Sequence, residues 1–311
     1  MSKVTVIGAG NVGATVANVL AHKDILNEII LLDIAGDLAR GKALDTWQQA
    51  PIDYYSTKVT GTEDYSLTAG SDIVVITAGI PRKPGMSRDD LISTNAKIVV
   101  SVVESILKES AEPIIIVVSN PLDVMTYAAY KASGLDSSKV FGMAGILDTA
   151  RYRAFLASAL QVSPKDIQAI LMGGHGDTMV PLPRYTTVSG IPVTELIQEE
   201  ELNAIVDRTK VGGGELVKLM GTSAWYAPGA ASAQMVEAIV RDENRIFPVC
   251  AKLTGQYGLE DLFVGVPVVL GAGGIQSVIE LKLKQDEMDL LHASAEQVRE
   301  VIQVFDSMNL I

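Results

Sequence analysis

The stretch from Val4 to Asp33 constrains the fold of this 311-residue chain more than any other part of it. It opens with the apolar run VTVI, which is typical of a strand buried on both faces of a parallel sheet. GAGNVG follows at once, from Gly8 to Gly13. The first glycine of such a run permits a tight turn, the second lets backbone approach a pyrophosphate, and the third lets the next helix pack closely on the strand. We therefore predict a strand, a phosphate-binding turn and a helix.

Asp33 adds a second signal at the end of the same stretch. It follows the run EIILL and lies 20 residues beyond Gly13, the spacing expected of a carboxylate that accepts hydrogen bonds from a ribose diol. Its charge would repel a 2′-phosphate, so the chain is predicted to bind NAD rather than NADP. GxGxxG alone occurs by chance in many chains, but here strand, helix and acid agree. A second glycine run, from Gly271 to Gly274, lacks the third glycine and predicts only a turn.

Strands continue to alternate with helices up to about residue 145. Apolar runs at 71–77 and 114–118 predict further buried strands, and the segments between them have helical spacing. This alternation predicts an α/β fold with a doubly wound parallel Rossmann sheet, whose ligands bind beyond the carboxyl ends of the strands. The residues that follow two of these ends are Thr77, Ala78, Gly79, Ser119 and Asn120.

The second half of the chain has a different pattern. Helices are predicted at about 146–160, 199–219, 230–241 and 285–309, with strands at 167–172, 246–253 and 266–270. This mixture predicts a mixed α+β substrate domain joined directly to the first. We place a cofactor-binding domain at 1–145 and a catalytic domain at 146–311, in agreement with the two domains that the length suggests.

Composition limits the expected partners and location. The net charge is −12 and no block of lysine and arginine stands out, so neither nucleic acid nor an anionic membrane is expected as a partner. No apolar run is long enough to cross a bilayer, and the N-terminus has a strand pattern and not that of a signal peptide, so a cytoplasmic location is expected. The single cysteine, Cys250, lies in an apolar run and predicts an inert buried thiol, and no metal site is expected.

His175 differs from the other two of the three histidines. The segment GGHGD places glycines on both sides of it, so the backbone there can adopt conformations denied to other residues and approach a ligand closely. We therefore predict a functional role for His175. His22 and His292 lie in helical patterns and are interpreted as structural or surface residues.

Asp148 and Arg151 are three residues apart on a predicted helix and share one face of it. One interpretation is a surface ion pair. The other is that Asp148 orients an imidazole while Arg151 binds a carboxylate through two parallel hydrogen bonds. The spacing alone leaves both open. Because the chain is acidic, any site for an anion has to be built locally from a few arginines.

Several segments resemble one known family. They are GAGNVG from Gly8, TAGIPRKPGMSR from Thr77, VSNPLD from Val118, LDTARYR from Leu147 and GGHGDTMVP from Gly173. In this order, and over the whole chain, they are similar to the lactate/malate dehydrogenase family, most closely to its malate-specific branch built on the lactate dehydrogenase plan. The resemblance implies reversible hydride transfer between (S)-malate and NAD, giving oxaloacetate and NADH.

The resemblance also implies roles for particular residues. His175 would accept the hydroxyl proton of malate and return it in the reverse direction. Asp148 would hold the imidazole in its working tautomer and stabilise the imidazolium. Arg151 would bind the carboxylate next to the reacting carbon, and Arg88 would polarise the carbonyl oxygen.

A cofactor site and an assembly are implied in the same way. The residues expected to hold NAD are Gly8, Ala9, Gly10, Asn11, Val12, Gly13, Asp33, Thr77, Ala78, Gly79, Asn95, Val118, Ser119 and Asn120. Asn120 is also expected to donate to the substrate, and Ser223 to line its pocket. The family suggests a homodimer or homotetramer and a place in the tricarboxylic acid cycle.

Substrate choice is expected to depend on Arg82. Lactate enzymes of the family carry glutamine at the matching position, whereas malate enzymes carry arginine. A guanidinium there would pair with the second carboxylate of malate or oxaloacetate, but the methyl group of pyruvate would leave it unpaired in a closing loop, which is costly. The alternative is that Arg82 is a solvated loop residue. Its position six residues before Arg88, among prolines and a glycine, favours a closing lid.

Other functions remain as alternatives. The first is an NAD-dependent lactate or other 2-hydroxyacid dehydrogenase. The second is a non-catalytic NAD-binding protein, against which the joint presence of His175, Asp148, Arg151 and Arg88 argues. Related NAD-dependent glycosidases need a divalent metal held by cysteine and histidine, and the sequence offers no such cluster.

Overall fold

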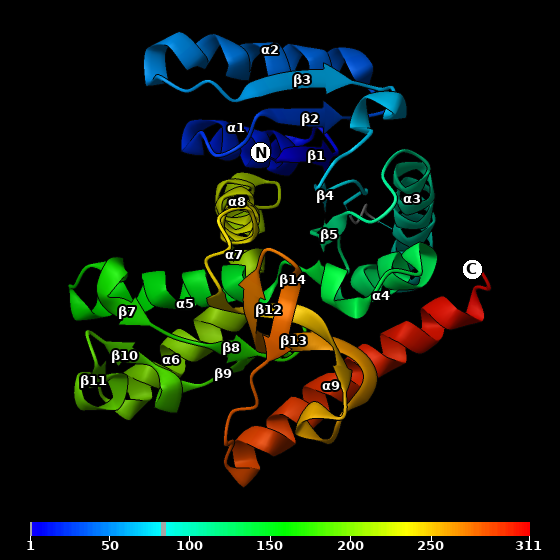
Figure 1. The fold of residues 1–311 in the computed structure, drawn as a ribbon. Coiled ribbons are helices and arrows are strands. Elements are labelled where there is room, and N and C mark those ends of the chain that lie inside the picture. Colours follow the sequence, from blue (N-terminus) through cyan, green and yellow to red (C-terminus); the bar gives the residue numbers. More distant parts are fainter. Residues whose placement is uncertain (1, 82–84) are drawn as a thin grey trace.

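The structure is a computed structural model that describes residues 2–81 and 85–311. Within these residues the main element is a nine-stranded sheet with strand order β14-β13-β12-β6-β5-β4-β1-β2-β3 (Figure 1). Its parallel part consists of β1 (Lys3–Ile7), β2 (Glu28–Leu32), β3 (Lys58–Thr62), β4 (Ile73–Ile76), β5 (Ile114–Val117) and β6 (Val140–Gly142). The order 3-2-1-4-5-6 is that of the doubly wound dinucleotide-binding fold. The predicted fold class is confirmed.

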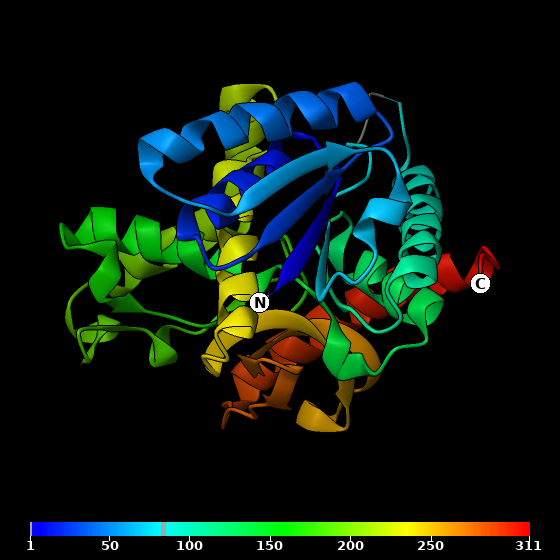
Figure 2. The same ribbon diagram turned by 45° about the horizontal axis from the view of Figure 1, so that its top comes forward.

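Helices connect these strands and cover the sheet. They are α1 (Asn11–Lys23), α2 (Gly36–Asp53), α3 (Arg88–Glu109) and α4 (Leu122–Ser133). α1 packs on β1 and β2, and α3 packs on α4, which lies against β5 and β6. Figures 1 and 2 show α2 along the outer edge of the sheet beside β3. Because helices cover both faces, β4 and β5 are apolar and buried at every position, which explains their unbroken runs of isoleucine and valine.

The second half extends the same sheet with antiparallel strands. These are β12 (Arg245–Thr254), β13 (Glu260–Gly271) and β14 (Gly274–Val278), and β12 pairs with β6 where Cys250 lies opposite Gly142. The predicted turn in the Gly271–Gly274 run is confirmed, since it joins β13 to β14. Cys250 is fully buried. The division of the chain between residues 145 and 146 stays a prediction.

Further helices and short strands surround this extension. The helices are α5 (Gly145–Leu160), α6 (Glu199–Lys210), α7 (Gly212–Met220), α8 (Tyr226–Val240) and α9 (Gln285–Ser307). The short strands β7 (Ile167–Gln168), β10 (Thr187–Val188) and β11 (Ile191–Pro192) form one small sheet, and β8 (Leu171–Met172) pairs with β9 (Val180–Pro181). α8 packs on α1 (Figure 1), while α9 packs on α4 and β13. Buried side chains of both halves form one large hydrophobic cluster, and a second cluster lies around α5, α6 and the small sheet.

Some predicted elements differ from the observed ones. The helix expected at 199–219 is two helices that meet at Val211, because three glycines begin α7 and weaken helix formation there. The strand expected at 167–172 is two short strands in different sheets. α8 begins at Tyr226, before the predicted residue 230, and β14 had no counterpart among the predicted strands.

Residues 2–81 and 85–311 contain neither a membrane-spanning helix nor a cluster of metal ligands. No helix in residues 2–81 or 85–311 combines the length and the apolar character needed to cross a membrane. The same residues contain no group of three or more His, Cys, Asp or Glu side chains arranged to hold a metal ion.

Candidate active site

The glycine-rich turn joins the carboxyl end of β1 to the start of α1. Gly8 has φ +101°, a conformation that favours glycine, and its N–H donates to the Leu32 carbonyl at 2.7 Å. A methyl group on Gly13 would lie 1.8 Å from the Gly8 carbonyl oxygen, so the helix can approach the strand only without a side chain there. A methyl group on Gly10 would meet nothing within 4 Å. The turn is therefore closed toward the sheet at Gly13 and open toward a ligand at Gly10.

The Asp33 carboxylate is fixed beside this turn. Its Oδ2 accepts the N–H of Ala9 at 2.6 Å, and its Oδ1 accepts the N–H of Ala35 at 2.9 Å. Each carboxylate oxygen has further acceptor capacity. The carboxylate thus lies next to the glycine-rich turn and has acceptor capacity left for a ligand.

The loops after β4 and β5 are braced by side chains that the sequence assigned to the cofactor. The Thr77 hydroxyl donates to the Ile7 carbonyl at 2.9 Å, and the Ser119 hydroxyl donates to the Ala78 carbonyl at 2.6 Å. Both groups therefore hold neighbouring backbone. The backbone of Ala78 and Gly79 thus lies just beyond the carboxyl end of β4, the edge at which ligands bind in doubly wound sheets.

Asn95 on α3 acts as a second brace. Its side-chain amide donates to the carbonyls of Ile80 at 3.1 Å and Asn120 at 2.6 Å, while its Oδ1 accepts the Ile80 N–H at 2.8 Å. The residue is 1% exposed. Both amide hydrogens are therefore used inside the chain, and a direct contact with NAD remains a prediction that depends on the free acceptor capacity of Oδ1.

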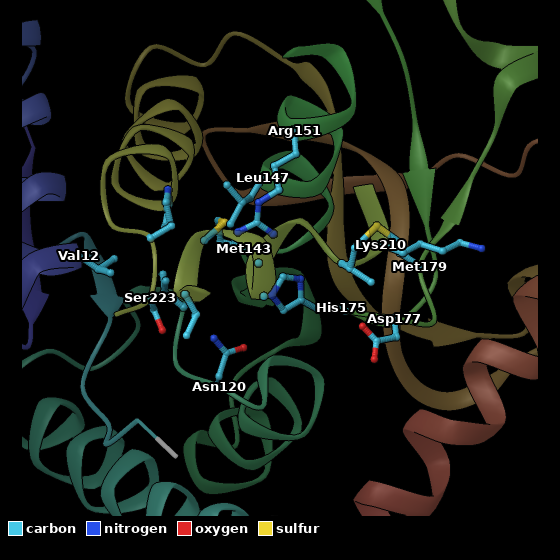
Figure 3. A pocket seen from close by; sticks show the side chains of 18 residues that line it. Val12, Asn120, Met143, Leu147, Arg151, His175, Asp177, Met179, Lys210 and Ser223 are labelled. Carbon is cyan, nitrogen blue, oxygen red and sulfur yellow. The ribbon is translucent and has the colours of Figure 1, made fainter. Parts of the chain in front are cut away.

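A cavity of about 440 Å³ lies between the glycine-rich turn at Gly8–Gly13 and the second half of the chain. Residues predicted for the site that line it are Val12, Val118, Asn120, Arg151, His175 and Ser223. Figure 3 shows the Arg151 guanidinium and the His175 ring directed toward one another at its centre, with Asn120 nearby. The fold thus brings together residues that are far apart in the sequence.

His175, Asp148 and Arg151 are joined through one carboxylate. Nδ1 of His175 lies 2.8 Å from Oδ2 of Asp148, and Nη1 of Arg151 donates to Oδ1 of Asp148 at 3.1 Å. The side chains of Asp148 and Arg151 are only 2% and 14% exposed, so their contact is not a surface ion pair. Nε of Arg151 has no hydrogen-bond partner among the described residues. Arg151 therefore has donors left for a ligand.

Asp148 owes its position to the start of α5. It lies in the first turn of that helix, where the partial positive charge of the helix N-terminus stabilises a carboxylate. Nδ1 of His175 is held by this carboxylate, so a neutral imidazole would carry its proton on Nδ1 and leave Nε2 as an acceptor. Such an imidazole can take a proton from a hydroxyl group.

The loop that carries His175 is held by backbone contacts. Gly173 and Gly176 have φ of +84° and +114°, which favour glycine, and confirm that this segment uses conformations other residues avoid. The N–H of His175 donates to Oδ2 of Asp123 at 3.0 Å. Asp123 was not among the predicted site residues, although it ends the segment VSNPLD.

The surroundings of His175 change its pKa. Burial alone lowers it, but the charge and hydrogen bond of Asp148 and the charge of Asp123 outweigh burial, so the pKa of His175 lies above its ordinary value of 6.5. The protonated form is therefore more favoured than in a free imidazole.

Arg88 lies at an adjoining cavity and does not line the one just described. It is the first residue of α3, after a capping box formed by Ser87 and Asp90, and it is exposed. Together with Asn120 and His175 it lines an adjoining cavity of about 420 Å³. Arg82, the predicted selector of substrate, lies outside the described residues.

The two other histidines lie elsewhere. Nε2 of His22 is 3.0 Å from Asp53, and Nε2 of His292 is 2.8 Å from the Tyr257 carbonyl oxygen. Neither lines the cavity that contains His175. Two charged residues that do line it, Lys210 and Asp177, were not predicted, because no motif marked Lys210 and Asp177 was considered only as part of the segment around His175.

A doubly wound sheet with a glycine-rich turn, facing a histidine that a buried carboxylate holds beside an arginine, defines the class of protein as a dinucleotide-dependent dehydrogenase. Within that class the chain belongs to the lactate/malate dehydrogenase family. Residues 2–142 match the model for the lactate/malate dehydrogenase NAD binding domain, and residues 146–307 match the model for the alpha/beta C-terminal domain. The resemblance inferred from the motifs is confirmed.

Individual relatives are similar over nearly the whole chain. A curated malate dehydrogenase from Cytophaga hutchinsonii is 67% identical over 307 residues, which cover 98% of each chain. The solved structure of malate dehydrogenase from Salinibacter ruber matches with a TM-score of 0.95 at 55% identity, covering 98% of each chain. A lactate dehydrogenase from Cryptosporidium parvum, complexed with lactic acid and nicotinamide adenine dinucleotide, matches with a TM-score of 0.94 at 37% identity and the same coverage.

Proposed function

We propose that the chain is an NAD-dependent malate dehydrogenase that interconverts (S)-malate and oxaloacetate. The observation that carries this proposal is the arrangement of His175, Asp148 and Arg151 in a cavity next to the glycine-rich turn. Asp148 lies 2.8 Å from Nδ1 of His175 and 3.1 Å from Nη1 of Arg151. A 2-hydroxy acid needs a base for its hydroxyl proton and a cation for its carboxylate. This arrangement offers both within one site.

The residues around the glycine-rich turn fit NAD. The open space at Gly10 and the N-terminus of α1 suit a pyrophosphate, and the fixed Asp33 carboxylate suits a ribose diol. Its charge opposes a 2′-phosphate, which favours NAD over NADP. NAD, when bound, supplies the acceptor for the hydride that leaves the substrate carbon. We expect Gly8–Gly13, Asp33, the backbone at 77–79 and residues 118–120 to hold it.

His175 would exchange the proton. In malate oxidation its neutral Nε2 would accept the hydroxyl proton, and in oxaloacetate reduction its imidazolium would protonate the carbonyl oxygen. Asp148 would keep the proton of the neutral ring on Nδ1 and stabilise the imidazolium as it forms. The short contact and the burial of Asp148 support this role.

Arginines would bind the substrate. Arg151, with a buried Nε that has no partner among the described residues, would bind the carboxylate beside the reacting carbon. Arg88, which lines the adjoining cavity together with Asn120 and His175, would polarise the carbonyl oxygen. Asn120 and Ser223, which line the main cavity, would complete the pocket.

Arg82 is the proposed selector between oxaloacetate and pyruvate. The sequence supports this role, because malate enzymes of the family carry arginine at this position. We expect Arg82→Gln to lower kcat/KM for oxaloacetate and raise it for pyruvate. The matched control is Lys83→Gln, which removes a neighbouring positive charge. An unchanged preference in Arg82→Gln would eliminate Arg82 as the selector.

The test of the function is steady-state oxidation of NADH with oxaloacetate, pyruvate and 2-oxoglutarate in parallel, repeated with NADPH. The proposal predicts fastest turnover with oxaloacetate and NADH. Preference for pyruvate would instead establish the alternative, a lactate or other 2-hydroxyacid dehydrogenase. Binding of NADH without turnover of any of the three would establish a non-catalytic NAD-binding protein.

The setting of the enzyme belongs to the same proposal. We propose a cytoplasmic enzyme that acts in the tricarboxylic acid cycle as a homodimer or homotetramer, with an NAD-binding domain at 1–145 and a catalytic domain at 146–311. Composition and family support these statements. Sedimentation of the purified protein measures the assembly directly.

A further inference from the structure

A second carboxylate contacts the histidine loop from a different helix. Asp123 is the second residue of α4, and its Oδ2 accepts the N–H of His175 at 3.0 Å. The contact joins residues 52 positions apart, so it ties the loop after β8 to the helix after β5. Asp148 holds the ring of His175, whereas Asp123 holds its backbone.

The other oxygen of Asp123 does not take part in the contact with His175. Oδ1 is buried and has no hydrogen-bond partner among the described residues. The thiol of Cys250 lies beside this carboxylate, and burial together with the charge and hydrogen bonding of Asp123 raises the pKa of that thiol. An asparagine could accept the same N–H from His175 without the cost of burying a negative charge. The presence of a negative charge at position 123, and not of a neutral amide, therefore requires an explanation.

The charged groups around His175 indicate which cation the Asp123 carboxylate stabilises. Asp148 and Arg151 face it from α5, Asp177 follows it in its own loop, and Arg88 from α3 and Lys210 from α6 line the cavities that it lines. Among these groups, the carboxylates in hydrogen-bond contact with His175 are Asp148 and Asp123. The cation closest to both is the imidazolium that forms when His175 takes a proton.

We propose that Asp123 is a positioning residue for His175, holding the backbone of the histidine loop and placing a second negative charge near the imidazolium. This inference deepens the proposed function and rests on it. With Asp148 on the ring and Asp123 on the backbone, the protonated histidine is stabilised from two elements. Loss of Asp123 would therefore weaken proton uptake as well as the placement of the ring.

The pKa directions of the two groups agree with this coupling. Burial raises the pKa of the Asp123 carboxyl above its ordinary value, and the N–H and charge of His175, with a hydrogen bond from the Cys250 thiol, limit that rise. In turn, the charge of Asp123 is among the causes that raise the pKa of His175. Each group thus favours the charged form of the other.

The test is a titration of His175 that needs no turnover. Histidine-labelled protein is titrated by NMR, with the His175 signal assigned by its loss in His175→Asn and with His22 and His292 as internal references. In Asp123→Asn, which can keep the acceptor but loses the charge, we expect the midpoint of His175 to fall by about one pH unit. The pH profile of kcat/KM for malate should move the same way, with little change in KM.

The matched control is Asp136→Asn, which removes one charge from an exposed carboxylate that caps a turn. It should leave the His175 midpoint in place. An unchanged midpoint in folded Asp123→Asn would overturn the inference, even if the wild-type enzyme turns over oxaloacetate. Asp123→Ser is a second neutral variant should the first misfold. Misfolding of both would also overturn it, because the carboxylate would then serve the fold.

Discussion

Nδ1 of His175 lies 2.8 Å from Oδ2 of Asp148, and this contact joins a glycine-flanked loop to the first turn of α5. The same carboxylate receives a hydrogen bond from Arg151 through its other oxygen. One buried group therefore positions both the proposed base and the proposed carboxylate-binding side chain. The residues that would move the proton and hold the substrate therefore depend on the same carboxylate.

Asp148→Asn tests the importance of this carboxylate. The amide can present its NH2 group to Nδ1, which would force the proton onto Nε2, and it cannot stabilise the imidazolium by charge. We expect kcat to fall by about 10²- to 10⁴-fold in both directions. Steady-state rates with malate and with oxaloacetate measure the effect. Asp64→Asn, at an exposed turn, is the control, and a near-normal rate in Asp148→Asn would contradict the assigned role.

The pH dependence of the two directions should be opposite. Malate oxidation needs neutral His175 and should rise with pH through the His175 pKa, whereas oxaloacetate reduction needs the protonated form and should fall. Because Asp148 and Asp123 keep this pKa above 6.5, the midpoint should lie above 6.5. Removing the charge in Asp148→Asn should move it to lower pH. The pH profiles of kcat/KM for the wild type and Asp148→Asn measure this shift. A midpoint that does not move would contradict the contact between Asp148 and His175.

Replacement of Gly13 and of Gly10 in the glycine-rich turn should affect the stability of the fold differently. In Gly13→Ala the new methyl group would lie 1.8 Å from the Gly8 carbonyl oxygen, so we expect a loss of stability of about 3 kcal/mol or more from overpacking. In Gly10→Ala the methyl group meets no protein atom within 4 Å, so the fold should survive while NADH binds more weakly. Denaturant unfolding and NADH fluorescence separate the two effects. Equal stability of the two variants would contradict this account.

Arg151→Lys tests the carboxylate site. Lysine keeps the charge but cannot form two parallel hydrogen bonds, so kcat/KM for oxaloacetate should fall by about 10- to 10²-fold while NADH affinity holds. Arg241→Lys, on an exposed residue at the end of α8, is the matched control. If Arg151→Lys affected NADH binding alone, the guanidinium would belong to the cofactor site.

The sequence predicted local structure well. The glycine turn, Asp33 and the buried strands follow from spacings within about one βαβ unit, where backbone geometry fixes what each residue type can do. The break at Val211 was missed because the apolar spacing continues through Gly212–Gly214, whose weak helix propensity ends α6. The extension of the sheet by β12 beyond β6 was not predicted either, because that pairing joins segments more than 100 residues apart in the sequence.

The candidate site could not be predicted from sequence spacing alone, because its contacts depend on the fold. Spacing alone could not decide whether Asp148 and Arg151 form a surface pair or hold His175, because the answer depends on burial and on a loop 27 residues away. The family resemblance supplied that link. Asp123 was not predicted as a site residue because its partner is the backbone N–H of His175, and no sequence motif indicates such a contact.

His175→Asn gives the most direct test of the central claim. Asparagine can fill much of the same space but cannot exchange a proton near neutral pH. We predict that NADH affinity stays near that of the wild type while oxaloacetate reduction falls by about 10²- to 10⁴-fold. A variant that binds NADH and still reduces oxaloacetate at the wild-type rate would contradict the claim that His175 carries the proton.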